Sequence, residues 1–362
     1  MAVFQSLGTI LLFFLILGGL VLVHELGHFA VARLARVRVL EFGIGFPPRA
    51  KVLGRGGETL YTLNWLPIGG FVKLEGEDGD AADDPRAFSA QPLLTRLVIL
   101  VAGVVMNVVL AFAIFTGIAI AGDPVIGIQA GRIQPDSPAA SAGLAPGDTI
   151  VSINGTRYSA FGAESLLDDL RSRAGQSITL GIERGSGETI DLAVTLRDAS
   201  GVAEGRGALG VEQLSARIAS GSLTYAPLEA LSIGVERTTS AMGLIIDGLG
   251  QLVSSMVTQP TEPPPAAGPV GIALQIGDIF WSLGPIVTLY LAGILSANLA
   301  VVNILPFPPL DGGRMLVLVL KSVLGARISL RFERLTYLVG FVFLFAFLIW
   351  VTGFDIARQL GG

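Results

Sequence analysis

The sequence has no cysteine and only two histidines, His24 and His28, among its 362 residues. The absence of cysteine excludes a disulfide framework, a thiol nucleophile and any thiolate metal site. Charged residues make up only 15% of the chain, whereas an ordinary soluble domain has about 25%. The net charge of −5 provides no basic surface of the kind that binds nucleic acid. The composition therefore disfavours a soluble domain, and no nucleic-acid partner is expected.

Charge is missing altogether from four long apolar stretches. They span residues 1–23, 97–121, 279–310 and 335–353. A membrane-spanning helix needs about 20 predominantly apolar residues, so the sequence predicts a polytopic α-helical membrane protein with four transmembrane helices. The first stretch lacks the basic start and the small-residue cleavage site of a signal peptide, and we expect it to be retained.

Lysine and arginine are unevenly distributed between the short loops of this four-helix scheme. Nine lie in 33–96, between the first two spans, and five lie in 314–334, between the last two. Positive charge favours the cytoplasmic side of a membrane, so both loops are expected in the cytoplasm. Both chain termini and the long segment 122–278 are then extracytoplasmic.

Composition and turn residues divide the chain into seven parts. The first three are 1–36, the first span; 37–84, a membrane-associated β region of short strands on the cytoplasmic side; and 85–121, an amphipathic lead-in helix and the second span. The other four are 122–214, a compact α+β domain; 215–278, an amphipathic surface helix and a proline-rich connector; 279–314, the third span; and 315–362, a short helix and the fourth span. Glycine and serine interrupt 224–258, so this segment is expected to lie on the membrane surface, and the acidic segment 75–84 is expected to be mobile.

His24, Glu25 and His28 form a His-Glu-x-x-His pattern at the end of the first apolar stretch. Residues four apart share one face of a helix, so the two imidazoles can bind one metal ion while Glu25 reaches a water on it. Zinc lowers the pKa of such a water to about 7, and Glu25 would be its general base. A chance pattern is disfavoured because ionisable groups at membrane depth are costly and usually functional.

A catalytic zinc usually has three protein ligands and one open position. With no further histidine, the third ligand must be an acidic residue, and Asp311 is the best candidate. It lies at the end of the third span, which the orientation places on the same side as His24. The residues alone leave a second role equally open, in which Asp311 caps the helix that follows it.

Two asparagines lie within apolar stretches, Asn107 in the second and Asn303 in the third. Asparagine in a membrane span often links helices through hydrogen bonds. This linking role is slightly favoured for Asn107, and contact with the substrate backbone is favoured for Asn303.

Several motifs occur in an order that is specific when taken together. They are HELGH at 24–28, FGIGFPP at 42–48, AGVVMN at 102–107, SPAASAGLAPGD at 137–148, GPVGI at 268–272 and NILPFPPLDGG at 303–313. In these motifs the chain resembles, over nearly its whole length, the site-2 protease family of intramembrane zinc metalloproteases. The resemblance is to the bacterial regulator-of-sigma-E protease type, with a single PDZ domain where the best-known members carry two.

The resemblance implies a role for each matching residue. His24, His28 and Asp311 would bind Zn²⁺, and Glu25 would be the catalytic base. Substrate contacts are implied for Asn303, Gly43, Gly45, Phe46 and Asn107. The sheet at 42–74 would lend an edge strand to an unwound substrate. Residues 122–214 would form a PDZ-like domain that either binds peptides at a turn near Ala208, Leu209 and Gly210 or only blocks large substrates.

The implied activity is hydrolysis of peptide bonds within or near transmembrane segments of single-span proteins. Anti-sigma factors and remnant signal peptides are the implied substrates, cut in regulated intramembrane proteolysis at the bacterial inner membrane. Two other functions are considered: a catalytically inactive membrane PDZ scaffold and a metal transporter. Intact HELGH and LDGG motifs disfavour the scaffold. The absence of charge from the second and fourth apolar stretches disfavours the transporter.

Overall fold

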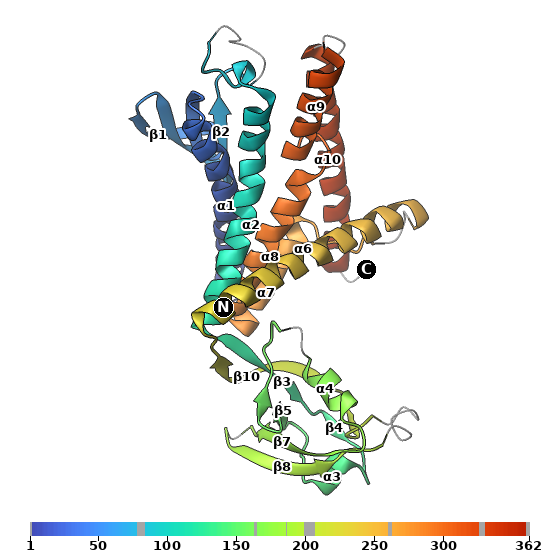
Figure 1. Ribbon diagram of the computed structural model, residues 1–362. Helices are drawn as coiled ribbons and strands as arrows, with labels where there is room; N and C mark the ends of the chain where they lie inside the picture. The colour runs from blue at the N-terminus through green and yellow to red at the C-terminus, as the bar shows by residue number, and fades with distance from the viewer. Residues whose placement is uncertain are drawn as a thin grey trace. The chain divides into compact units, whose positions relative to one another are not determined.

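The computed structural model describes residues 2–77, 84–162, 165–185, 187–198, 207–259, 263–325 and 330–359. The chain divides into two compact units, of which the first comprises residues 1–116 and 232–362 and the second residues 117–231. The first unit holds the long apolar helices, and the second is built around a β-sheet (Figure 1).

Five of the described helices are long and apolar enough to cross a membrane, so the chain is a membrane protein. They are α1 (Ala2–Leu34), α2 (Leu93–Ala121), α6 (Pro227–Thr258), α8 (Pro285–Ile304) and α10 (Leu330–Gln359). The predicted first, second and fourth spans each fall within one of these helices, namely α1, α2 and α10.

Helix α6 decides how many spans the protein has. It qualifies by length and composition, whereas the sequence predicts a helix along the membrane surface. Glu236, Arg237 and Asp247 interrupt its apolar character, and Figure 1 shows α6 running at a wide angle to α1 and α2. The number of four spans therefore stays a prediction that depends on this helix.

The third apolar stretch differs from the single helix that the sequence predicts. Helix α7 (Pro269–Leu283) ends before Gly284, which has a φ of 87°, and α8 begins at Pro285. A proline cannot donate the backbone hydrogen bond that would continue the preceding helix. After α8, residues 305–310 form a loop, and α9 (Asp311–Leu324) begins four residues earlier than the short helix predicted within 315–362.

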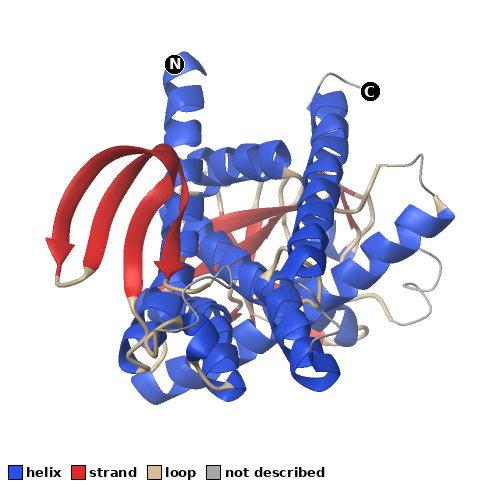
Figure 2. Ribbon diagram, turned by 90° about the horizontal axis from the view of Figure 1, so that it is seen from above, coloured by secondary structure: helices blue, strands red, loops and turns tan. Residues whose placement is uncertain are grey.

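The β region consists of two long strands, β1 (Val39–Gly56) and β2 (Thr59–Leu74), rather than the short strands expected. Residues 41–44 pair with both 60–63 and 70–73, whereas 49–56 pair only with 59–64. Segment 70–74 therefore lies at one edge of the sheet and 49–56 at the other. Figure 2 shows the sheet as a curved layer.

The segment between this sheet and α2 also differs from expectation. Instead of an amphipathic lead-in helix, the structure has a single 3-10 turn, η1 (Phe88–Ala90), and α2 begins at Leu93. The acidic segment predicted to be mobile falls for the most part outside the described residues.

The sheet is held against α1 by aromatic side chains. Phe29 of α1 packs its ring edge-on against Phe42, with centroids 5.1 Å apart, and also lies 6.2 Å from the Tyr61 ring. Such pairs stabilise by about 0.5–1.5 kcal/mol beyond the area that they bury. Because Phe29 directly follows His28, this packing fixes the sheet beside the His-Glu-x-x-His turn.

The second unit is α+β. Its main sheet has the order β10-β3-β5-β7-β8, and β6 pairs with β5. The strands are β3 (Asp123–Gln129), β5 (Thr149–Ile153), β6 (Thr156–Arg157), β7 (Ser177–Glu183), β8 (Thr189–Thr195) and β10 (Ser215–Leu223). A smaller sheet joins β4 (Arg132–Ile133) to β9 (Val211–Glu212), and the helices are α3 (Pro138–Ser141) and α4 (Leu166–Ser172). The PDZ-like assignment and its limits at 122–214 stay predictions.

Helices α1 and α2 cross at Gly27, inside the His-Glu-x-x-His motif. A Cβ atom on Gly27 would overlap the Ala102 carbonyl oxygen and lie 2.7 Å from Met106 Cγ. Only a glycine allows this approach, since the Ala102 carbonyl oxygen cannot move without shifting α2.

We expect Gly27→Ala to destabilise the protein by about 1–3 kcal/mol, the usual cost of overpacking. Gly19→Ala on the same helix is the matched control, because a Cβ there meets no atom within 4 Å. Thermal unfolding in detergent should give a lower midpoint for Gly27→Ala only. Equal midpoints for the two variants would contradict a tight crossing at Gly27.

Candidate active site

Three side chains from two helices converge on one point among the membrane helices. His24 Nε2 lies 2.9 Å from Asp311 Oδ2 and 3.1 Å from His28 Nε2, and His28 Nε2 lies 3.3 Å from the same Asp311 oxygen. One ligand atom from each residue falls within 4.8 Å of the other two. Both histidines are buried, and Asp311 is half-buried. The structure thus brings together all three residues predicted to bind metal.

Local sequence explains why these side chains meet. His24 and His28 are one helical turn apart on α1, so their rings share a face. Asp311 is the first residue of α9, and Leu310 occupies the N-cap position. The capping role considered for Asp311 is therefore wrong, and its carboxylate points at His24 instead. Gly312 allows the turn, since a Cβ there would overlap the carbonyl oxygens of Leu305 and of Ile304, the last residue of α8.

Helix α2 supports both imidazoles from behind. His28 Nδ1 lies 2.8 Å from the Ile99 carbonyl oxygen, and His24 Nδ1 lies 3.3 Å from Asn107 Nδ2. Between these contacts is Gly103, where a Cβ would overlap the rings of both histidines. Sequence reasoning missed Ile99, because a backbone carbonyl leaves no signal in the residue type.

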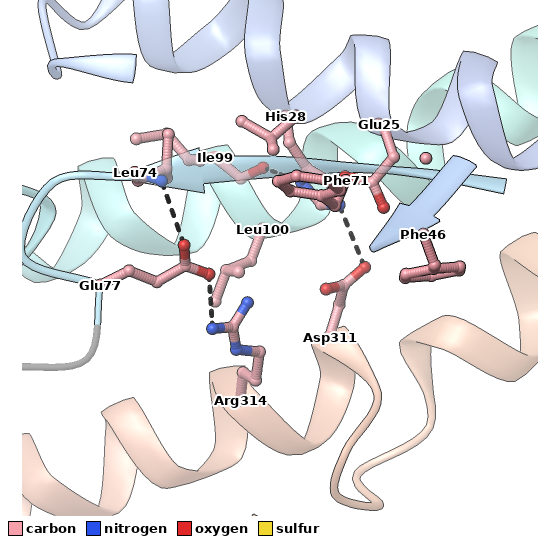
Figure 3. A pocket seen from close by; sticks show the side chains of 12 residues that line it. Glu25, His28, Phe46, Phe71, Leu74, Glu77, Ile99, Leu100, Asp311 and Arg314 are labelled. Carbon is pink, nitrogen blue, oxygen red and sulfur yellow. Dashed lines mark hydrogen bonds and ion pairs between the residues drawn. The ribbon is translucent and has the colours of Figure 1, made fainter. Parts of the chain in front are cut away.

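A cavity of about 250 Å³ opens beside the cluster (Figure 3). Figure 3 shows Glu25 and Asp311 on its wall, with the rings of Phe46 and Phe71 beside them. The residues that line it come from α1, the sheet, α2 and α9: Glu25, His28, Phe46, Gly70, Phe71, Val72, Leu74, Glu77, Ile99, Leu100, Asp311 and Arg314. Glu25 is not part of the cluster of His24, His28 and Asp311, so its carboxylate is available to a molecule held in this cavity.

An ion pair that the sequence analysis did not single out also lines the cavity. Arg314 Nη2 lies 2.5 Å from Glu77 Oε1, and Glu77 Oε2 accepts the N–H of Leu74 at 3.2 Å. The guanidinium of an arginine keeps its proton at every pH that a protein meets. Arg314 is therefore a fixed positive charge. Its place one helical turn after Asp311 was the signal that could have identified it.

The residues predicted to contact substrate are placed in different ways. Phe46 lines the cavity. Gly43 gives room to the Phe71 ring, and Gly45, with a φ of 79°, lets β1 bend. Asn303 is half-buried in α8, and Asn107 is fully buried against His24. Neither asparagine is among the described residues that line the cavity.

The predicted peptide-binding turn lies in the second unit. Ala208 and Leu209 are buried in its hydrophobic core. The carbonyl oxygens of Ala208, Leu209 and Gly210 accept hydrogen bonds from the N–H groups of Arg197, Ala139 and Gln134. Peptide binding at this turn stays a prediction.

The donor set fits zinc. Two imidazole nitrogens and one carboxylate oxygen leave one tetrahedral position open, which is the arrangement of catalytic rather than structural zinc sites. His28 also has the outer partner expected of a metal ligand, because its Nδ1–H donates to a backbone carbonyl. The glycine at position 103 leaves room for both rings at this point.

Comparison with known proteins identifies the family. The model of "Peptidase family M50" matches residues 12–347. A protein of Synechocystis sp. named "Putative zinc metalloprotease" is 34% identical over 340 residues, covering 91% of this chain and 89% of the relative. A Clostridium perfringens protein with the same description is 32% identical, covering 93% and 95%. The Arabidopsis thaliana "Probable membrane metalloprotease ARASP2, chloroplastic" is 34% identical, covering 90% and 74%. The chain therefore belongs to peptidase family M50, the site-2 protease family of zinc metalloproteases.

Proposed function

We propose that this chain is an active endopeptidase that hydrolyses peptide bonds within or near the transmembrane segments of single-span membrane proteins. One observation carries the proposal: His24, His28 and Asp311 converge beside a cavity that Glu25 also lines. The helices that supply these side chains include α1, which is long and apolar enough to span a membrane. Residues of this kind persist at membrane depth when they have a function.

Each residue of the site has a distinct task in the proposed mechanism. His24, His28 and Asp311 would hold the zinc ion, which supplies a Lewis acid and lowers the pKa of a water ligand to about 7. Glu25 on the cavity wall would take the proton from the attacking water and pass it to the leaving amine. Phe46 and Phe71 would shield the reacting groups from bulk water, and Arg314 would keep a positive charge in the cavity.

The substrate would be bound in an extended form beside the sheet. A helical segment hides its peptide bonds, so it must unwind before it can be cut. Gly70, Val72 and Leu74 line the cavity and belong to an edge of the sheet. An unwound substrate can add to such an edge as a further strand, and the edge then supplies backbone hydrogen-bond partners.

The proposed setting is the bacterial inner membrane, with the active site toward the cytoplasm. Substrates would be anti-sigma factors and remnant signal peptides, cut in regulated intramembrane proteolysis. The second unit would act as a PDZ-like domain outside the cytoplasm, and both termini would lie on that side. This topology needs four spans, with α6 lying along the membrane surface, which its exposed charged residues Glu236 and Asp247 support.

Glu25→Gln should retain zinc but cut a tagged single-span substrate about 10²–10⁴-fold more slowly, the range that general acid–base catalysis contributes. The amide keeps the shape of the carboxylate but cannot accept the proton. Purified wild type and variant would be assayed in detergent, with and without a chelator, and zinc would be quantified in both. Wild-type rates in the variant would show that Glu25 is not the base.

The same experiment tests the inactive-scaffold alternative. An inactive scaffold would leave the substrate intact in wild type and variant alike, whatever the zinc content. Chelation should abolish wild-type cleavage, and added zinc should restore it.

Removal of the third ligand should weaken zinc binding. We expect Asp311→Asn to lower zinc affinity by more than the roughly 10–100-fold typical of an outer-shell partner. Asp278→Asn on α7 is the control, since Asp278 is not part of the three-residue cluster. Zinc content after dialysis against buffered zinc measures the difference. Equal zinc content in the two variants would exclude Asp311 as a ligand.

The edge strand can be tested by cross-linking, because the chain contains no cysteine. In a Glu25→Gln background, Val72→Cys should form a disulfide with a substrate that carries one cysteine near its scissile bond. Val52→Cys is the control, because residue 52 is exposed and belongs to the opposite edge of the sheet. Gel analysis after mild oxidation measures the yield. Equal yields from both positions would disprove docking at residues 70–74.

A further inference from the structure

Three residues at four-residue intervals on α2 face the two histidines of α1. Ile99 offers its carbonyl oxygen to His28, Gly103 leaves room for both rings, and Asn107 presents its side-chain amide to His24. Positions i, i+4 and i+8 lie along one face of a helix. Ile99 at one end of this face therefore contacts Nδ1 of His28, and Asn107 at the other end contacts Nδ1 of His24. The Nε2 atoms of both rings point to Asp311.

The proton on His28 is fixed by its partner. A backbone carbonyl can only accept a hydrogen bond, so His28 Nδ1, at 2.8 Å from the Ile99 oxygen, must be the donor. In the neutral ring this leaves Nε2 with a free lone pair, directed at the centre of the three-residue cluster. Ile99 thus selects the tautomer that a metal ligand requires.

His24 faces a side chain that can be either donor or acceptor. Asn107 Nδ2 lies 3.3 Å from His24 Nδ1. Asn107 is fully buried, and no described residue donates a hydrogen bond to its Oδ1. An unpaired buried acceptor costs about 1–3 kcal/mol. A half-turn of the amide would exchange its two ends and bring Oδ1 to His24 Nδ1.

We propose that Asn107 Oδ1 accepts the Nδ1–H of His24 when zinc is bound, so that Asn107 is a positioning residue for this ligand. When His24 Nε2 gives its lone pair to the metal, the ring proton lies on Nδ1 and needs an acceptor. The Asn107 side chain is buried against His24 Nδ1, and its Oδ1 atom can be this acceptor. This inference rests on the zinc ligands of the proposed function, but it assigns Asn107 a role distinct from substrate contact.

Ser296 of α8 holds this part of α2 in place. Its hydroxyl donates to the Asn107 carbonyl oxygen at 2.8 Å, and the serine is fully buried. This bond links the two helices through the backbone of Asn107 and does not involve its side-chain amide. Ser296→Ala therefore disturbs the same helix contact but leaves the acceptor for His24 intact, which makes it a matched control.

The test measures zinc affinity in the purified full-length protein by competition with a chromophoric chelator, together with the visible spectrum of the cobalt-substituted protein. Asn107→Leu keeps the volume but removes the acceptor, and should bind zinc about 10–100-fold more weakly. Asn107→Asp supplies a carboxylate oxygen at the same place, and should bind zinc at least as tightly as wild type. Ser296→Ala should match wild type, and only Asn107→Leu should show an altered cobalt spectrum.

Each outcome decides the inference. Wild-type affinity in Asn107→Leu would overturn it, and so would a loss in Asn107→Asp as large as the loss in Asn107→Leu, which would indicate packing alone. If Asn107→Leu does not fold, the retained affinity of Asn107→Asp still tests the acceptor. A wild-type protein without zinc would overturn the proposed function as well, whereas zinc in wild type with no effect at position 107 would overturn only this inference.

Discussion

Polar groups buried between membrane helices must find their partners within the protein, because the hydrocarbon core offers none. His24, His28 and Asp311 satisfy one another at 2.9–3.3 Å, and α2 satisfies the outer nitrogen of each ring. Much of the first unit follows from this requirement. Helix α2 must approach α1 closely, α9 must begin at Asp311, and glycines must stand wherever a side chain would separate these helices.

In the proposed mechanism, the sheet beside α1 would bring a substrate to the buried cluster. Phe42 and Tyr61 of the sheet pack on Phe29, the residue that follows His28. This packing fixes the sheet beside the histidines. The edge of the sheet at residues 70–74 then forms part of the cavity wall, next to Glu25. The three-residue cluster and the edge of the sheet thus meet at one small cavity, which is what the proposed hydrolysis of an extended peptide would require.

The chemistry of this site could be predicted from the sequence better than its supporting structure. Two lone histidines at helical spacing predict a metal-binding helix. The residues alone left Asp311 open between metal ligand and helix cap, and the resemblance that rests on motif order decided for the ligand. The break at Gly284 and the early start of α9 were not predicted, because the uncharged apolar run was interpreted as one span, although Gly284 and Pro285 form a turn signal within it. The roles of Ile99 and Asn107 depend on which face of α2 meets α1, and packing sets that face.

The central claim is that His24, His28 and Asp311 hold one zinc ion through two nitrogens and one oxygen. X-ray absorption at the zinc edge of the purified protein tests this directly. The account predicts one zinc per chain, bound by two imidazoles, one carboxylate and a further oxygen. A spectrum without imidazole scattering, or a protein that holds no zinc, would contradict it.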